Sequence, residues 1–197
     1  MTRLLCWVLL LHLPTFICGS ARPDVGSIEI NKGWRFSKGD DPIWSDPTFD
    51  DSQWEAVAVG APWEKLGFAN YDGLGWYRLR VNVPSALKDD PGIAKFGRLR
   101  LSLGKIDDVD QTWWNGRLIG QTGHISEPYT TKWQQERSYS VAVDEIRWDE
   151  ENVIAVRVFD GQGDGGMYEG PYRLSVVSLQ DIVKIRISDG DGDGVVN

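Results

Sequence analysis

One stretch of the sequence, residues 104–120, gathers the residue types that could bind a ligand. It contains three carboxylates and two adjacent tryptophans: Asp107, Asp108, Asp110, Trp113 and Trp114. Ionised carboxylates accept hydrogen bonds from hydroxyl groups, and the flat face of a tryptophan ring packs well against the C–H face of a sugar. The combination therefore indicates a surface for a hydroxyl-rich ligand.

The Asn115-Gly116 pair predicts that this stretch forms a β-hairpin, because a type I′ turn needs positive φ at both central residues. A two-residue turn pairs Trp114 with Arg117, Trp113 with Leu118 and Thr112 with Ile119. Side chains alternate between the faces of a strand, so the two tryptophans must point in opposite directions. We expect one ring in the core and the other, Trp114 or Trp113, open to a ligand.

The three aspartates of this hairpin allow more than one role. Asp108 and Asp110 share a face and could hold a calcium ion together, whereas Asp107 could join them only through a bulge. Alternatively, one of the acids pairs with Arg117 or caps the turn at Gly104, which the spacing favours.

Two further loops supply aromatic and acidic residues for the same surface. They span residues 60–75 and 160–171, and the second is rich in glycine, which lets the backbone approach a ligand closely. A third loop, residues 42–54, is dense in turn-forming Asp and Ser residues, and we favour a structural role for it. The complete set of expected ligand contacts is Trp63, Asp72, Trp76, Asp107, Asp108, Trp114, Asp160, Asp164 and Tyr168.

The elements that must position these residues are short alternating runs separated by turn residues, with no helical period. This pattern predicts an all-β sandwich. Residues 76–83 show it best, with Tyr77, Leu79, Val81 and Val83 facing inward and Arg78, Arg80 and Asn82 facing water. The expected strands are residues 27–30, 33–37, 55–59, 75–83, 98–103, 109–114, 117–121, 138–143, 152–159 and 172–179.

The N-terminal residues have the pattern of a secretory signal peptide, with Arg3, an apolar run and small residues before position 21. We expect residues 1–20 to be removed and the protein to be secreted, in the periplasm or outside the cell. Cys6 and Cys18 both lie in this segment, so the mature chain has no thiol chemistry.

The net charge of −8 argues against nucleic acids and membranes as partners, while the ten tryptophans fit either sugar recognition or a large β core.

The C-terminal residues 181–197 resemble the start of a calcium-binding loop that is cut off before its last ligand. Alternating acids wrap a hard cation within one tight turn, and the carbonyl of a later residue completes such a loop. The sequence predicts weak calcium binding here, and a disordered acidic tail is the alternative. The expected ligands are Asp189, Asp191, Asp193 and Val195.

Several segments read in order resemble one known family. They are Trp34-Arg35-Phe36, residues 49–54, Tyr71-Asp72-Gly73, Trp76-Tyr77-Arg78, residues 104–120, residues 152–158 and Gly165-Gly166-Met167-Tyr168. Together they resemble the sugar-binding jelly-roll domain of family 2 glycoside hydrolases, and more closely its version in bacterial sialate O-acetylesterases. The resemblance covers residues 28–178, and it implies a galactose-binding-like β-sandwich over residues 27–180 that is not catalytic by itself.

Three functions remain open from the sequence. The first is a secreted module that binds carbohydrate beside a glycoside hydrolase or esterase. The second is a structural domain that packs against a catalytic domain of the same full-length protein. The third, a minor hydrolase activity of this chain, is the least favoured, because the sequence has no Gly-x-Ser-x-Gly motif and His124 has no evident catalytic partner.

Overall fold

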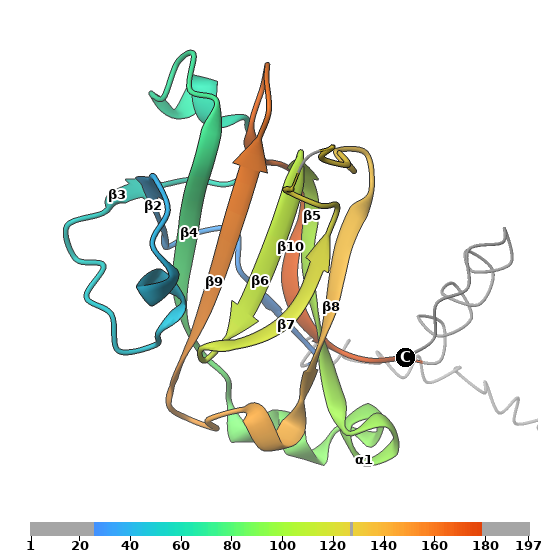
Figure 1. The fold of residues 1–197 in the computed structure, drawn as a ribbon. Helices are drawn as coiled ribbons and strands as arrows, with labels where there is room; N and C mark the ends of the chain where they lie inside the picture. The colour runs from blue at the N-terminus through green and yellow to red at the C-terminus, as the bar shows by residue number, and fades with distance from the viewer. Residues whose placement is uncertain (1–25, 127, 179–197) are drawn as a thin grey trace, which may run out of the picture.

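The computed structural model describes residues 26–126 and 128–178, which form two antiparallel β-sheets packed face to face (Figure 1). This arrangement confirms the expected β-sandwich. The six-stranded sheet consists, in spatial order, of β3 (Glu55–Val57), β2 (Trp34–Lys38), β4 (Gly73–Asn82), β9 (Glu151–Asp160), β6 (Val109–Trp114) and β7 (Arg117–Thr122). The four-stranded sheet consists of β1 (Ser27–Glu29), β10 (Gly166–Val176), β5 (Arg98–Asp107) and β8 (Glu136–Ala142).

Helical structure in the described residues is confined to short connecting segments. These are the 3-10 turns η1 (Pro42–Ser45), η2 (Trp63–Leu66), η3 (Ser85–Asp89) and η4 (Val143–Glu145) and the helix α1 (Pro91–Phe96). The sequence pattern did not predict α1. This helix is bounded by residues that cap its two ends: the Asp90 side chain accepts a hydrogen bond from Gly92 N at 2.7 Å, and Gly97 ends the helix at φ +62°. None of these helices combines the length and the apolar character needed to cross a membrane.

The main core lies between the two sheets. Inward-facing side chains of β5 alternate with outward ones, so that Leu99, Leu101 and Leu103 are fully buried, as the period of two predicts. They belong to one cluster with Ile154 and Val156 of β9. Because apolar area removed from water is the main favourable term in folding, this cluster is what holds the sheets together.

The β6–β7 hairpin forms as expected at its turn and departs from expectation three residues away. Asn115 and Gly116 have φ of +49° and +85°, and Trp114 pairs with Arg117 and Trp113 with Leu118. Thr112, however, pairs with Gly120 because a bulge shifts the register between Thr112 and Trp113.

Gly120, on the shifted side of that bulge, lies directly against an aromatic ring of the other sheet. A Cβ at this position would lie 2.2 Å from the ring of Tyr139 in β8. The hydroxyl groups of Thr122 and Tyr139 are hydrogen-bonded at 2.8 Å. These contacts join β7 to β8 along one side of the sandwich.

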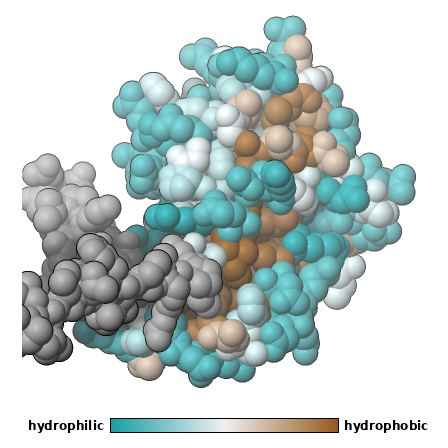
Figure 2. Space-filling model, turned by 180° about the vertical axis from the view of Figure 1, so that it is seen from behind, coloured by the Kyte–Doolittle hydropathy of each residue, from teal (hydrophilic) through white to brown (hydrophobic). Residues whose placement is uncertain are grey.

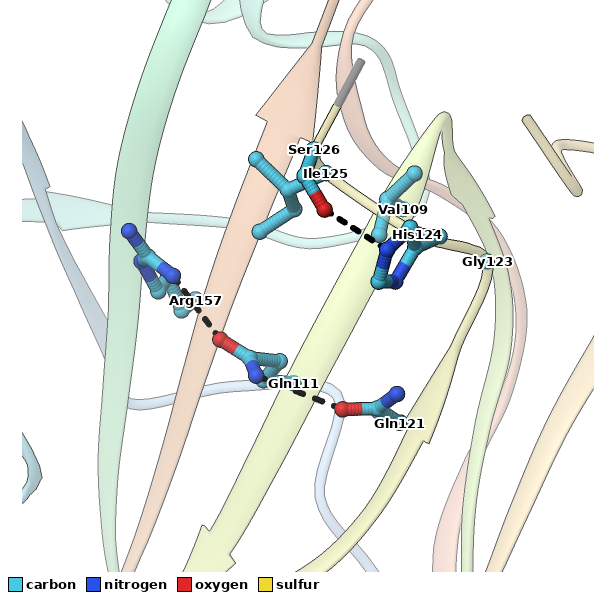
Figure 3. A pocket seen from close by; sticks show the side chains of 8 residues that line it. All are labelled: Val109, Gln111, Gln121, Gly123, His124, Ile125, Ser126 and Arg157. Carbon is cyan, nitrogen blue, oxygen red and sulfur yellow. Dashed lines mark hydrogen bonds between the residues drawn. The ribbon is translucent and has the colours of Figure 1, made fainter. Parts of the chain in front are cut away.

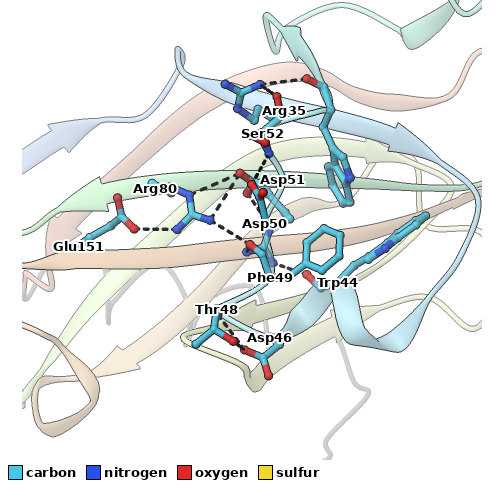
Figure 4. Close-up of polar contacts among 12 residues, drawn as sticks. Arg35, Trp44, Asp46, Thr48, Phe49, Asp50, Asp51, Ser52, Arg80 and Glu151 are labelled. Atoms are coloured by element: carbon cyan, nitrogen blue, oxygen red, sulfur yellow. Dashed lines mark hydrogen bonds and ion pairs between the residues drawn. The ribbon is translucent and has the colours of Figure 1, made fainter.

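A cluster of aromatic side chains covers the part of the outer face of the six-stranded sheet that β4 forms. The loop of residues 39–54 folds over β4, and the ring centroid of Trp44 lies 5.0 Å from that of Trp54 and 6.1 Å from that of Trp76. Asp50 accepts a hydrogen bond from Ser52 N at 2.9 Å, the turn-forming role expected of this loop (Figure 4). The loop therefore belongs to the scaffold.

This covering loop corrects one expectation from the sequence, the exposure of Arg78. Arg78 is 0% exposed, and its Nε donates a hydrogen bond to Asp51 Oδ2 at 2.8 Å. Arg80, on the same face, also contacts Asp51 and forms a 2.7 Å ion pair with Glu151 (Figure 4). Alternation of the strand correctly placed both arginines outward, but it could not show that a distant loop covers that face.

A second buried ion pair lies between the sheets. Asp110 of β6 and Arg137 of β8 are 2.8 Å apart, and both side chains are fully buried. Asp110 also accepts hydrogen bonds from Thr112 and Tyr139 at 2.9 and 2.7 Å. Asp110 is thus a structural acid whose partner is Arg137, and Arg117 pairs instead with Glu145.

The two acids that contact Arg80 allow a matched test of buried against exposed ion pairs. We expect Asp51→Asn to lower the free energy of unfolding by about 3–5 kcal/mol, because it leaves the buried Arg78 without its counter-charge. Glu151→Gln, which removes a largely exposed partner, should lower it by about 0–1 kcal/mol. Urea denaturation of the two variants measures both values, and equal losses would contradict the structural role given to Asp51.

Candidate functional site

A groove of ≈ 310 Å³ opens on the outer face of the six-stranded sheet (Figure 3). Its floor comes from three adjacent strands, because Gln111 of β6 lies opposite Arg157 of β9 on one side and Gln121 of β7 on the other. The lining residues are Val109, Gln111, Gln121, Gly123, His124, Ile125, Ser126 and Arg157. The site thus depends on the register of three strands.

The floor of the groove is a row of hydrogen-bonded polar side chains. Arg157 Nη1 donates to Gln111 Oε1 at 2.9 Å, and Gln111 Nε2 donates to Gln121 Oε1 at 3.3 Å (Figure 3). Asp40 anchors the row, since it accepts hydrogen bonds from Arg157 Nε at 2.7 Å and from Trp76 Nε1 at 2.9 Å. Burial acts to raise the pKa of Asp40, but the hydrogen bonds from Arg157 and Trp76 outweigh it and hold the pKa below its ordinary value.

The wall of the groove is the turn that follows β7. Gly123 has φ +80°, and a Cβ there would lie 2.6 Å from the Thr130 carbonyl, so the position requires glycine. Backbone hydrogen bonds in both directions, at 3.1 and 2.9 Å, tie His124 to Thr130. His124 Nε2 and Ser126 Oγ are 2.6 Å apart, which orients the imidazole along the wall.

These groups can recognise hydroxyl groups. Amides and hydroxyls both donate and accept hydrogen bonds, which matches the hydroxyl groups of a saccharide. Among the described residues, the lining contains neither Asp nor Glu.

Several of the acids expected from the sequence lie together at a different place, the end of the sandwich where β5 and β9 end. Gly166 pairs with Asp107, and Asp108 Oδ2 accepts a hydrogen bond from Gly161 N at 3.0 Å. Asp160 is fully buried, and its Oδ2 has no hydrogen-bond partner among the described residues.

Two of these acids, Asp107 and Asp160, have strongly raised pKa values. Burial, followed by the hydrogen bond and negative charge of Asp108, raises the pKa of Asp107 to about 8. Burial is also the main cause that raises the pKa of Asp160 to about 7, with the charges of Asp108 and Asp72 adding to it. These carboxyl groups are therefore largely protonated in mildly acidic solution.

The structure corrects the expected role of three tryptophans. Trp63, Trp76 and Trp114 are 0%, 1% and 1% exposed, so none offers a ring face to a ligand. Trp114 lies in the core, and it is Trp113 that points outward and stacks on Trp76, with ring centroids 5.0 Å apart. The sequence left open which of the two tryptophans faces outward, and the structure shows that it is Trp113, whereas the set of expected contacts named Trp114.

The remaining expected contacts differ in their surroundings. Asp72 and Asp164 are exposed on loops. Tyr168 is partly buried, and its hydroxyl donates to the Trp133 carbonyl at 2.7 Å.

The expected calcium ligands Asp189, Asp191, Asp193 and Val195 lie outside the described residues, so calcium binding there stays a prediction. Within residues 26–126 and 128–178, no three acidic, His or Cys side chains are grouped to hold a metal ion.

The sequence analysis missed the floor of the groove. Gln111, Gln121 and Arg157 carry no motif. Gln121 pairs with Gln111 only because of the bulge in the hairpin, and Arg157 meets Gln111 through a strand far away in the sequence. One signal was available: Arg157 is the single charged residue in the otherwise apolar run of residues 153–158.

Comparison with known proteins places this geometry in context. No family model matches the chain. The chain is 26% identical over 144 residues to the β-galactosidase BoGH2A of Bacteroides ovatus, a match that covers 66% of the chain and 15% of that enzyme. The chain is similar to family 2 glycoside hydrolases. The similarity extends over part of the chain, and the matched region is a small fraction of the relative.

Solved structures show the same fold. A β-glucuronidase of Bacteroides uniformis matches with a TM-score of 0.59 and 22% identity, over 75% of this chain and 17% of the enzyme. A β-glucuronidase from glycoside hydrolase family 2 matches with a TM-score of 0.60 and 16% identity, over 76% of this chain and 17% of that enzyme. The sandwich is thus the fold of one domain found in these enzymes.

The raised pKa values at the end of the sandwich predict a pH-dependent stability. Asp107 and Asp160 ionise near pH 3.8 when unfolded but at about 8 and 7 when folded, so the folded protein binds more protons in between. The free energy of unfolding should therefore fall as the pH rises from about 4 to about 8 and level off above that.

Urea denaturation across this pH range tests the expectation with matched variants. Asp107→Asn should make the fall shallower, whereas Asp164→Asn, which removes an exposed carboxylate from the next loop, should keep the wild-type slope. A slope that is the same in Asp107→Asn and the wild type would sink the prediction.

Proposed function

We propose that the chain is a secreted, non-catalytic module of a glycoside hydrolase that binds carbohydrate in the groove over Gln111, Gln121 and Arg157. The observation that carries this proposal is the fixed polar row on the groove floor. The similarity of the chain to family 2 glycoside hydrolases supports the choice of a saccharide over other hydroxyl-bearing ligands.

The outward tryptophan of the hairpin adds the apolar contact that sugar binding needs. Trp113 lies two residues after Gln111 in β6, so both side chains project from the same outer face. The ring is partly exposed and stacks on the buried Trp76, which fixes its orientation. Trp113 does not line the groove itself, so in this proposal the saccharide extends from the groove along β6. Its hydroxyls would then meet amide and guanidinium groups, and its C–H face would meet the Trp113 ring.

The burial of Asp160 supports a module without catalysis of its own. Asp160 is fully buried and out of reach of a substrate, although its pKa is raised as that of a general acid would be. In this proposal the catalytic domain is a separate unit that the module accompanies, in a glycosidase or in an esterase of the sialate O-acetylesterase type.

A purely structural module is the second candidate. The burial of Trp63, Trp76 and Trp114 favours it, because the tryptophan content of the chain serves packing in large part. In that case the groove would bind no saccharide, and its role would be to contact the catalytic domain.

NMR titration of the ¹⁵N-labelled chain with methyl β-galactoside and methyl β-glucuronide separates the two candidates. We expect saturable shifts of the side-chain amides of Gln111 and Gln121. Gln121→Ala should weaken binding about tenfold, which corresponds to the loss of one good hydrogen bond. Gln53→Ala, an exposed glutamine of the covering loop, is the control and should bind as the wild type does. Absence of groove shifts with both glycosides would favour the structural candidate.

A chromogenic assay tests the absence of catalysis. With 4-nitrophenyl β-galactoside and 4-nitrophenyl β-glucuronide, we expect nitrophenolate to be released no faster than in buffer alone, because no pair of described carboxyl groups lines the groove. Turnover that Asp107→Asn abolishes would instead make the acidic end of the sandwich an active site.

A further inference from the structure

The guanidinium of Arg157 is the main charge of the groove. Besides His124, whose imidazole can ionise, Arg157 is the one charged side chain among the described residues of the lining. Its side chain is 22% exposed, so most of the group lies within the molecule, and its open part faces the groove floor (Figure 3). The groups that surround this charge therefore determine which ligands the groove attracts.

Asp40 neutralises the guanidinium from a position next to the groove. Arg157 Nε donates a hydrogen bond to one carboxylate oxygen of Asp40 at 2.7 Å, and Arg157 Nη2 donates to the other oxygen. Two parallel hydrogen bonds of this kind are how arginine binds the carboxylate of a ligand. Asp40 thus occupies the edge of the guanidinium that a ligand carboxylate would otherwise take.

Asp40 is held in this position and in its charged form. Trp76, which is 1% exposed, donates a hydrogen bond from Nε1 to Asp40 Oδ1 at 2.9 Å. Burial acts to raise the pKa of Asp40, but the hydrogen bonds from Arg157 and Trp76 keep it below its ordinary value. The ion pair is therefore fully formed at neutral pH, before any ligand arrives.

Neutralisation leaves the groove with hydrogen-bond donors and little net charge. A guanidinium has five N–H groups. Asp40 accepts from two of them, and Gln111 Oε1 accepts from a third at 2.9 Å. The other N–H groups have no acceptor among the described residues and suit the oxygen of a neutral hydroxyl. A ligand carboxylate, by contrast, would lose water of hydration and come close to the negative charge of Asp40.

We infer that the groove selects neutral saccharides over acidic ones and that Asp40, as a positioning residue for Arg157, sets this preference. The inference rests on the proposed function, because it names the class of saccharide for the same groove. The net charge of −8 acts in the same direction, since a negative protein repels anions at long range.

NMR titration of the full ¹⁵N-labelled chain tests the preference with two pairs of sugars that differ only at C6. They are methyl β-galactoside with methyl β-galacturonide, and methyl β-glucoside with methyl β-glucuronide. We expect the neutral members to shift the side-chain amides of Gln111 and Gln121, and the acidic members to bind at least about fivefold more weakly, the scale of one half-exposed ion pair. Added salt should lessen this difference, because it screens the repulsion.

Asp40→Asn tests whether Asp40 sets the preference. The variant removes the negative charge and keeps a side-chain oxygen that can accept from Trp76 Nε1. We expect each acidic sugar to gain about fivefold in affinity relative to its neutral partner, and the gain should shrink as salt is added. A merely structural role of Asp40 would weaken both members of a pair alike and leave their ratio unchanged.

Glu29→Gln is the control, because it also removes one negative charge but from an exposed side chain of β1. β1 belongs to the four-stranded sheet, which lies behind the six-stranded one in Figure 1. The view from behind shows a largely hydrophilic surface with a hydrophobic area near its middle (Figure 2). Glu29→Gln should keep the wild-type ratio within each pair.

Two results would overturn the inference: equal affinity for the two members of a pair in the wild type, and an unchanged ratio in Asp40→Asn. The wild-type comparison needs no variant, so it decides the preference even if Asp40→Asn fails to fold. Failure of the proposed function is distinguishable, because then no sugar of either pair shifts Gln111 or Gln121, and the inference falls with it.

Discussion

The middle parts of strands β4 and β9 are buried on both faces, and the rest of the structure depends on this constraint. Their inner faces pack in the main core, and the outer face of β4 is covered by residues 39–54. The cover places the guanidinium of Arg78 in the interior, where Asp51 must neutralise it. The surface left open on this sheet is the part over β6, β7 and the end of β9, and the groove lies there.

Charge divides the sandwich into regions with different chemistry. Acids collect where β5 and β9 end, and there burial and mutual repulsion raise the pKa values of Asp107 and Asp160. The two interior acids that stay paired, Asp51 and Asp110, each face an arginine. Three cations, Lys95, Arg98 and Arg100, line a cavity on the outer face of the four-stranded sheet. One small fold thus presents a neutral polar groove, an acidic end and a basic face.

The sequence predicted local features and missed those that depend on distant segments. The Asn-Gly turn, two of three cross-strand pairs and the alternation of β5 follow from residues close in the chain. The burial of Trp76 and Arg78 comes from a loop more than twenty residues away, which alternation within one strand cannot show. The groove floor was missed for a related reason, because Gln111 and Arg157 meet only through the pairing of β6 with β9.

The seam between β7 and β8 bears on how the protein avoids association with itself. An open sheet edge presents unpaired N–H and C=O groups that can template another chain. On one side of the sandwich, the contacts of Tyr139 with Gly120 and Thr122 bring the two edge strands together. On the opposite side, the edges are β1 and β3, each three residues long. Within the described part of the chain, neither side offers a long, flat edge, which disfavours strand addition and the fibrous aggregation that follows from it.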